Sequence, residues 1–331
     1  MRKLCALAVA IVLLGAPGHA SETTAGRLPS GDGEPLVAVQ IRRLDERNRY
    51  GDRKVAFDLF LVRPGADPVR LTRTGKAFAP SPRPDGKRIA FVCRDRYWNQ
   101  VCTVPAGGGR SRLVTASGGH KSTPSWSPDG RRFGYGIYES GTPNELRTFQ
   151  VRRRREQVVW READESVVLG NMGVSWSPDG ATLAFDRRAT AVEDSPAPLP
   201  VLTGSRGWQI WGLDVASGEV RPLIDDYPWQ YDPFYSPDGE RIVFVTWSGT
   251  SAPSQIVHAR PDGSDPVQVT RGSSSATSPS FSRDGRWIYF IRDGNVYRTD
   301  LLGTQTEVVV RAAGRRSYFD AIPMPASAAA G

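Results

Sequence analysis

The chain has few of the residues from which most catalytic and metal sites are built. Its 331 residues include only three histidines and three cysteines. His120 and His258 are the histidines that follow the first 20 residues, and they lie far apart in the sequence. No His-Glu-x-x-His, paired-cysteine zinc or Gly-x-Ser-x-Gly pattern occurs. We therefore expect no metal site, no cofactor and no catalytic centre of these types.

Long apolar runs are also missing. The longest, Leu4 to Leu14, is shorter than the roughly 20 residues that a membrane-spanning helix needs. It follows Arg2 and Lys3 and leads to small residues ending at Ala20, which is typical of a secretory signal peptide. We expect residues 1–20 to be this signal peptide, 21–35 to be a flexible segment, and the protein to be periplasmic or secreted without a membrane span.

The formal charge of +8 comes mainly from scattered arginines. The one dense cluster, Arg152–Arg155, is interpreted as a solvated strand or turn. No nucleic-acid-binding motif accompanies it, so we expect no nucleic acid partner. A weak preference for anionic surfaces stays open.

One phrase recurs through the chain and ends each time in Asp-Gly. The aspartates are separated by 44 to 59 residues, which is the spacing of propeller blades. Proline, aspartate and glycine together favour a tight turn between two strands. The phrases are Pro80–Gly86, Pro124–Gly130, Val174–Gly180, Pro233–Gly239 and Pro279–Gly285.

The segments after these turns predict the rest of each blade. Runs such as 89–92 and 242–245 are apolar at every position, which is typical of a strand buried on both faces. Two further strands follow each run, so each repeat predicts one four-stranded blade.

The two ends of the chain carry complementary parts of one more blade. Residues 36–43, 55–63 and 69–72 predict second, third and fourth strands, whereas 317–323 predicts a lone first strand. We therefore expect an all-β, six-bladed β-propeller over 36–325, closed by the C-terminal strand, with a flexible tail at 326–331. We expect it to be a monomer.

The Ser-Pro-Asp-Gly repeats resemble those of the TolB-like propeller family, over roughly residues 34–325. The resemblance implies the propeller fold and a place in the cell envelope. The family's namesake carries an α/β domain ahead of its propeller, for which residues 21–35 leave no room.

Cys93 and Cys102 lie at the facing ends of two predicted neighbouring strands. Export makes a disulfide chemically reasonable. We expect these two cysteines to be bonded to each other.

With so few catalytic residues, we expect the protein to function by binding. In a propeller, the loops entering the first strands and those joining second to third strands share one face, here called the mouth face. Aromatic loop side chains supply contact area to partners. The expected partner-binding residues are Lys121, Asn171, Trp229, Gln230, Tyr231, Asp232, Arg316 and Tyr318.

A long insertion at residues 187–208 should lie on the same face. We expect this face to bind an envelope protein or peptide. The alternative is a glycan- or small-ligand-binding propeller enzyme that uses carboxylates on the channel wall.

Overall fold

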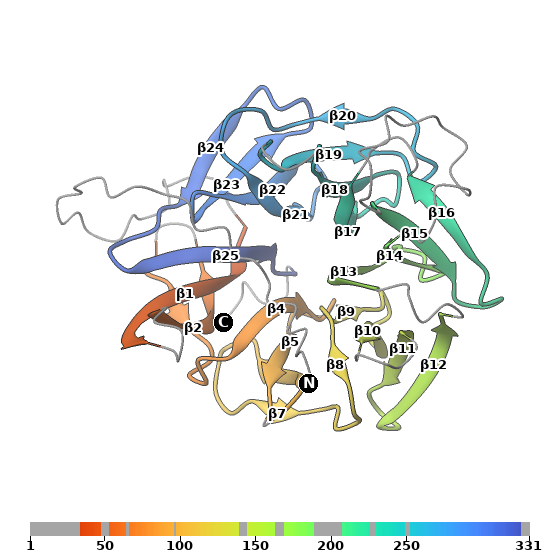
Figure 1. Cartoon of the computed structure of the whole chain (residues 1–331). Helices are drawn as coiled ribbons and strands as arrows, with labels where there is room; N and C mark the ends of the chain where they lie inside the picture. The colour runs from red at the N-terminus through yellow and green to blue at the C-terminus, as the bar shows by residue number, and fades with distance from the viewer. Residues whose placement is uncertain are drawn as a thin grey trace, which may run out of the picture.

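The computed structural model shows six antiparallel sheets arranged as the blades of a ring (Figure 1). No helix occurs in the described residues, and hence none that could span a membrane. The predicted signal peptide, most of 21–35, the tail at 326–331 and most of the insertion lie outside those residues. The described residues are 34–47, 53–63, 66–95, 97–138, 144–162, 169–188, 207–224, 229–248 and 252–325.

Blade 1 combines the two ends of the chain, and blades 2 to 6 follow in sequence. The strands are: in blade 1, β25 (Arg316–Pro323), β1 (Leu36–Arg47), β2 (Arg53–Val62) and β3 (Val69–Arg70); in blade 2, β4 (Ala77–Pro82), β5 (Arg88–Arg94), β6 (Asn99–Pro105) and β7 (Arg112–Leu113); in blade 3, β8 (His120–Lys121), β9 (Ser125–Trp126), β10 (Arg132–Tyr138), β11 (Glu145–Gln150) and β12 (Arg155–Arg161); in blade 4, β13 (Leu169–Trp176), β14 (Thr182–Arg188), β15 (Trp208–Asp214) and β16 (Val220–Ile224); in blade 5, β17 (Gln230–Tyr235), β18 (Ile242–Thr246), β19 (Gln255–Ala259) and β20 (Val267–Gln268); and in blade 6, β21 (Ala276–Phe281), β22 (Trp287–Arg292), β23 (Asn295–Asp300) and β24 (Thr306–Val310).

The ring closes as the sequence predicted. β25 pairs antiparallel with β1, with Leu36 opposite Pro323 and Arg42 opposite Arg316. The six-bladed architecture and the closing strand are therefore confirmed. Blade 3 differs in one detail, because its innermost strand is split into β8 and β9, which pair with opposite ends of β10.

The second strands are buried on both faces, which explains their continuous apolar runs. In β18, Ile242 and Phe244 belong to a core cluster shared with blade 4. Val243 and Val245 belong to a different cluster, shared with blade 6. Since successive side chains of a strand point to opposite faces, each blade fills two interfaces at once.

The repeated turn is held by its own side chains. In blade 3, the Ser127 hydroxyl donates to Asp129 Oδ1 at 2.6 Å, and the same oxygen accepts the backbone N–H of Arg131 at 3.0 Å. Gly130 has a φ of 61°, a conformation that favours glycine. The recurrence of Asp in each of the five phrases therefore reflects turn structure.

The other serine of the phrase joins neighbouring blades. Ser81 Oγ accepts the backbone N–H of Trp126 at 3.3 Å. Ser125 and Ser175 accept in the same way from the first strands of the following blades, at 3.4 and 3.1 Å. The phrase thus encodes contacts between blades as well as a turn.

The predicted disulfide is present. Cys93 on β5 and Cys102 on β6 are bonded, with their Cα atoms 5.7 Å apart. The residues are diagonal neighbours across the strand pair, since Cys93 faces Gln100 and Cys102 faces Phe91.

Reducing this disulfide should lower the free energy of unfolding by about 2–3 kcal/mol, because the unfolded chain regains the entropy of a short loop. Urea unfolding of the oxidised protein, the reduced protein and the Cys93→Ala/Cys102→Ala variant measures this. The reduced protein and the variant should agree, and identical midpoints for all three would contradict the prediction.

Candidate functional site

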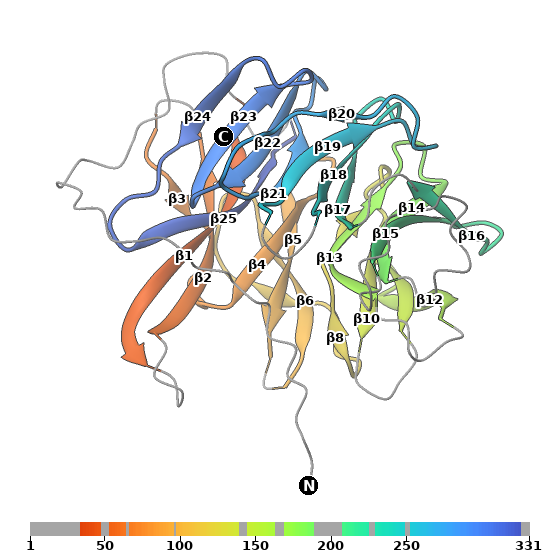
Figure 2. The same ribbon diagram turned by 45° about the horizontal axis from the view of Figure 1, so that its top comes forward.

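The mouth face carries the loops that join second to third strands, together with the entries to the first strands. Figure 2 shows the β1–β2 and β5–β6 hairpins extending on the same side of the ring as β8. The innermost strands β4, β13, β17, β21 and β25 surround the centre (Figure 1). A side chain at the start of an innermost strand therefore lies near both the mouth face and the ring axis.

Blade 5 presents an aromatic pair here. The rings of Trp229 and Trp247 meet edge to face with centroids 5.3 Å apart. The backbone N–H of Trp247 donates to the carbonyl of Trp229 at 3.1 Å, and its indole N–H donates to the carbonyl of Ala252 at 2.8 Å. Trp229 is thus held in place while it stays partly exposed.

Tyr231 lies two residues further along the chain and is also partly exposed. Its hydroxyl is 3.1 Å from that of Ser254, and its ring packs against the core between blades 5 and 6. Burial raises the pKa of the Tyr231 hydroxyl, so the group is a neutral hydrogen-bonding partner near neutral pH.

Asp232 occupies a strained position in the innermost strand of blade 5. Its φ is 60°, in the left-handed region that few residues other than glycine adopt. Gly173 of blade 4 makes room for it, because a Cβ on this glycine would lie 3.0 Å from Asp232 Cα and 3.1 Å from its Oδ1. Ala79 and Ser278 have the same conformation in the corresponding bulges of blades 2 and 6, so it belongs to the blade architecture.

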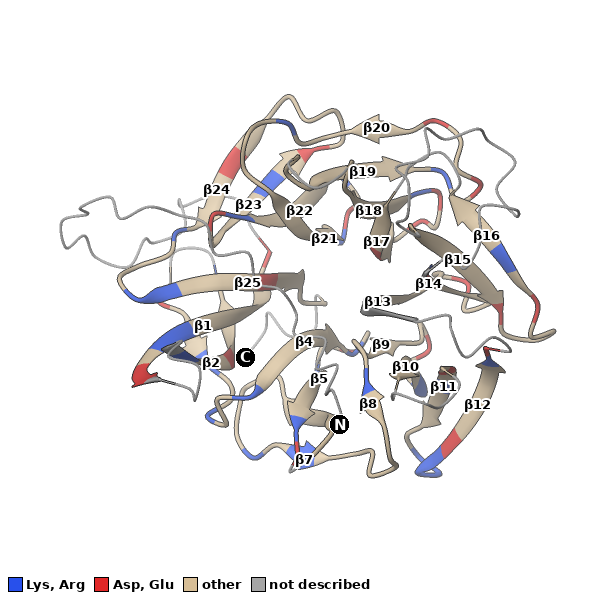
Figure 3. Cartoon of the chain, viewed as in Figure 1, with Lys and Arg blue, Asp and Glu red and all other residues tan. Residues whose placement is uncertain are grey.

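Asp232 is influenced electrostatically by two other carboxylates of this region. Burial raises the pKa of Asp232 well above its usual range, and the charges of Asp320 and Asp186 raise it further. Burial also raises the pKa of Asp186 and of Asp320 to about 7. Figure 3 shows the acidic segments of β17 and β25 beside the centre of the ring. We call these three residues the acidic centre.

Asp186 reaches this region from β14. It is 2% exposed, and its Oδ1 accepts the backbone N–H of Gly173 at 3.1 Å. The acidic centre therefore spans blades 1, 4 and 5, with Gly173 between two of its members.

The structure buries three of the predicted binding residues. Gln230 is fully buried, and its Oε1 accepts the N–H of Ile210 at 3.2 Å. Lys121 is 1% exposed, and its ammonium group donates to the carbonyls of residues 117–119. Tyr318 is also buried, 3.5 Å from the Gln40 amide nitrogen. All three side chains are held by hydrogen bonds in the interior, and their binding role stays a prediction.

The remaining predicted residues differ in their placement. Arg316 is exposed at the start of β25. The backbone of Asn171 lies in β13, but its side chain is outside the description. The structure brings Trp229, Tyr231 and Asp232 together, and their binding role stays a prediction.

A second aromatic group on the mouth face was not predicted. His120 stacks on Tyr138 with ring centroids 5.2 Å apart, and Trp98 meets it edge to face at 5.1 Å. Tyr97 beside them is 77% exposed. The sequence contained one indication of this group, because Tyr97 and Trp98 are adjacent aromatic residues in a predicted loop.

The described residues contain no group of three or more His, Cys, Asp or Glu side chains placed to hold a metal ion. His258 is buried and contacts the Leu301 carbonyl at 2.9 Å and Arg241 at 3.2 Å. His258 and His120 lie in different blades, as the sequence implied.

Comparisons with known proteins support this architecture. The family model for the lipoprotein LpqB beta-propeller domain matches residues 230–320. The structure of TolB from Acinetobacter baumannii aligns with a TM-score of 0.68 at 18% identity, over 88% of this chain and 67% of that one. This chain has the TolB-like six-bladed propeller fold. The resemblance to the TolB-like propeller family, which the sequence repeats indicated, is confirmed.

Sequence relatives of the TolB-like propeller are distant. The uncharacterized peptidase YuxL of Bacillus subtilis is 27% identical over 197 residues, which cover 50% of this chain and 28% of YuxL. The uncharacterized protein Atu1656 of Agrobacterium fabrum is 24% identical over 227 residues, covering 63% and 67% of the two chains. The match thus spans little more than a quarter of the peptidase.

The acidic centre should make stability depend on pH. The pKa of Asp186 is about 7 in the folded protein, against an ordinary 3.8, so the folded state holds the proton more tightly than the unfolded state. This carboxyl therefore destabilises the fold increasingly as the pH rises from 4 to 7. Asp186→Asn keeps the oxygen that accepts from Gly173. It should raise the free energy of unfolding by about 1–3 kcal/mol at pH 8 and have little effect at pH 4.

Asp179 provides a control of opposite sign. The Ser177 hydroxyl lowers its pKa in a blade turn, so Asp179→Asn should reduce stability at neutral pH. Denaturant titrations at pH 4, 6 and 8 compare both variants. An Asp186→Asn protein that is no more stable than wild type at pH 8 would disprove the assigned protonation.

Proposed function

We propose that this TolB-like propeller acts outside the cytoplasm as a monomeric scaffold and binds an extended segment of an envelope protein at its mouth face. The partly exposed Trp229, held by Trp247 beside Tyr231, is the observation that carries the proposal. Rigid aromatic side chains provide contact area at low entropic cost and are frequent binding hot spots.

The comparisons support the envelope location. TolB shares the fold, and the matching family model describes a propeller domain of a lipoprotein. The fold alone does not specify a partner, so the proposal depends on the site.

The two aromatic groups suggest how a segment would lie. Trp98, His120 and Tyr138 belong to blades 2 and 3, whereas Trp229 and Trp247 belong to blade 5. An extended chain that crosses the mouth face would contact both groups and pass above the acidic centre. Backbone N–H groups or a basic side chain of that segment would be favoured next to the three carboxylates.

A Trp229→Ala/Tyr231→Ala protein should bind its partner about thirtyfold more weakly, a loss of about 2 kcal/mol. The fold should persist, because both side chains are partly exposed and only the Tyr231 ring also packs against the core between blades 5 and 6. The partner is first captured by crosslinking in the envelope fraction, and its affinity is then measured with purified proteins. Trp287→Ala, at the opposite end of a strand in blade 6, is the matched control. Unchanged affinity in a normally melting double variant would refute the site.

The acidic centre favours a second candidate, an enzyme that acts on a glycan or another small ligand. A carboxyl with a raised pKa can act as a general acid near neutral pH. Release of reducing ends from a panel of envelope oligosaccharides tests this activity. Turnover that disappears in Asp320→Asn and in Asp232→Asn would support an enzymatic function. Absence of turnover by the wild type would contradict that function and favour the scaffold function.

A further inference from the structure

Several arginines on the described strands are paired with carboxylates. These pairs cross strands or blades and hold N–O distances between 2.6 and 2.9 Å. They include Arg70 with Asp58, Arg147 with Glu145 and Glu156, Arg161 with Glu145, and Arg187 with Glu162.

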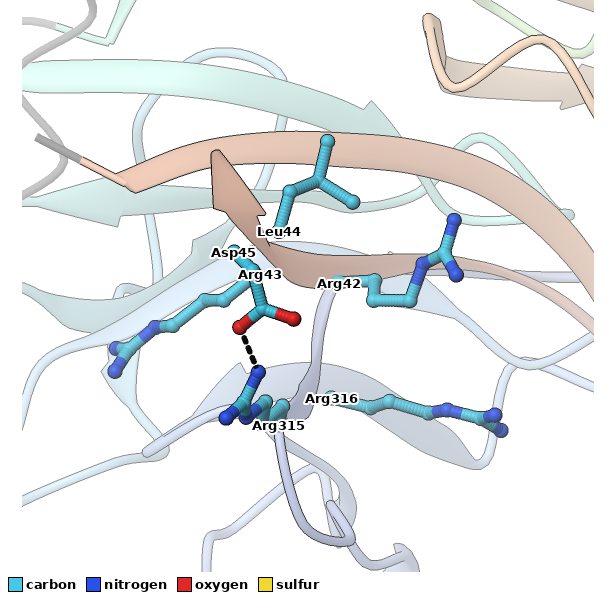
Figure 4. A pocket seen from close by; sticks show the side chains of 6 residues that line it. All are labelled: Arg42, Arg43, Leu44, Asp45, Arg315 and Arg316. Atoms are coloured by element: carbon cyan, nitrogen blue, oxygen red, sulfur yellow. Dashed lines mark hydrogen bonds and ion pairs between the residues drawn. The ribbon is translucent and has the colours of Figure 1, made fainter. Parts of the chain in front are cut away.

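One cluster on blade 1 brings several arginines together with a single carboxylate. A pocket of about 260 Å³ lies where β1 and β25 meet on the mouth face, lined by Arg42, Arg43, Leu44, Asp45, Arg315 and Arg316. Four guanidinium groups share one carboxylate, and Asp45 is paired with Arg315 (Figure 4). We call this the arginine pocket.

Arg42 and Arg316 are directly opposite each other in the strand register. Both are exposed, and their side chains extend to the same side in Figure 4. No carboxylate in the described parts of the chain forms an ion pair with either of them. Like charges at facing positions of a strand pair are destabilising, so an anion that contacts both would relieve a repulsion built into the closing strands.

The chemistry of the pocket favours carboxylate groups on a flexible chain. Guanidinium groups bind carboxylates through paired, charge-assisted hydrogen bonds. Leu44 adds an apolar wall. The carboxyls of the acidic centre, whose raised pKa favours the protonated form, offer no attraction to negative charge, so the rim of blade 1 is the favourable place for it.

A flat anionic membrane fits the same surface less well. The neighbouring hairpin carries Asp45 and Glu46, whose side chains are 84% and 72% exposed. These carboxylates are paired with Arg315 and Lys54, and a flat lipid surface would meet them together with the arginines, whereas a narrow peptide can contact Arg42 and Arg316 alone.

We propose that the arginine pocket binds an acidic stretch of the protein segment that occupies the mouth face, and that this binding strengthens the β1–β25 pair that closes the ring. The inference rests on the proposed scaffold function and specifies the partner's charge. The partner would therefore combine an acidic stretch, seated on blade 1, with an uncharged or basic stretch near the axis.

The test uses the full chain and an N-acetylated hexaglutamate peptide as the probe. Wild type is compared with Arg42→Gln/Arg316→Gln and with Arg131→Gln/Arg152→Gln. The second pair removes the same charge from another arginine-lined pocket, beside the turn at Asp129. Calorimetry should show binding that weakens about tenfold or more in the first variant and less than about twofold in the second. The peptide should also raise the melting temperature of the wild type and of the control, but not of Arg42→Gln/Arg316→Gln.

Further measurements distinguish specific binding of the acidic peptide from non-specific attraction and from binding of phosphate or lipid. Equal weakening in both double variants would show non-specific attraction and overturn the site. Binding of inorganic phosphate or of phosphatidylglycerol vesicles without binding of the peptide would overturn the peptide assignment. Should the double variant fail to fold, the exposed single change Arg316→Gln provides the same readout.

The Trp229→Ala/Tyr231→Ala protein separates this inference from the proposed function. Peptide binding that survives in that variant and is lost in Arg42→Gln/Arg316→Gln supports the arginine pocket even if the aromatic site fails. Peptide binding that is unaffected by the arginine changes overturns the pocket and leaves the aromatic site to its own test.

Discussion

The pairing of β25 with β1 is the interaction on which the rest of the ring depends. It joins residues as distant as Gln40 and Tyr318, which are 278 positions apart. Each second strand is apolar on both faces, so every blade needs a neighbour on each side. A ring that failed to close would expose apolar surface and unpaired strand edges at both ends. Closure of the ring therefore depends on the junction of β1 and β25. This junction contains the buried Gln40 and Tyr318 and lies next to the arginine pocket.

Much of this architecture could be predicted from the sequence because the residues of the repeat determine a specific turn between two strands. The Asp-Gly turns marked the blades, and the incomplete segments at 36–72 and 317–323 predicted the closing sheet. The disulfide followed from the placement of two cysteines on neighbouring strands. These features depend on local conformation and on strand order, both of which periodicity records.

The details of the site depend on contacts between blades, which periodicity does not record. Asp186 follows an apolar run on a second strand, and only the structure shows that it reaches Gly173 of the preceding strand. Lys121 and Gln230 read as loop residues at the mouth, yet backbone groups from their surroundings hold both in the interior. A polar residue next to a strand can either face solvent or form hydrogen bonds in the interior, and its sequence neighbours do not distinguish the two cases.

Charge is distributed unevenly over the face that we propose for binding. The acidic centre lies near the axis, aromatic side chains lie around it, and the arginine pocket lies at the rim of blade 1. A bound segment would meet arginines at the rim and largely protonated carboxyls near the axis, and this difference favours one direction of the segment over the reverse direction. Such an arrangement gives specificity without a deep cavity.

The serine contacts between blades are unevenly distributed, and this has a mechanical consequence. Ser81, Ser125 and Ser175 each fix the first strand of the next blade through a directional hydrogen bond. Blade 5 has Phe234 at the corresponding position, which packs into the apolar cluster shared with blade 6. Apolar contacts resist separation but tolerate sliding, because they have no preferred direction. At the junction of blades 5 and 6 the directional contacts are therefore made by other segments: the Ala276 N–H donates to the Ser254 carbonyl at 2.8 Å, and His258 Nε2 lies 2.9 Å from the Leu301 carbonyl. These two blades are held in register by groups outside the repeated phrase.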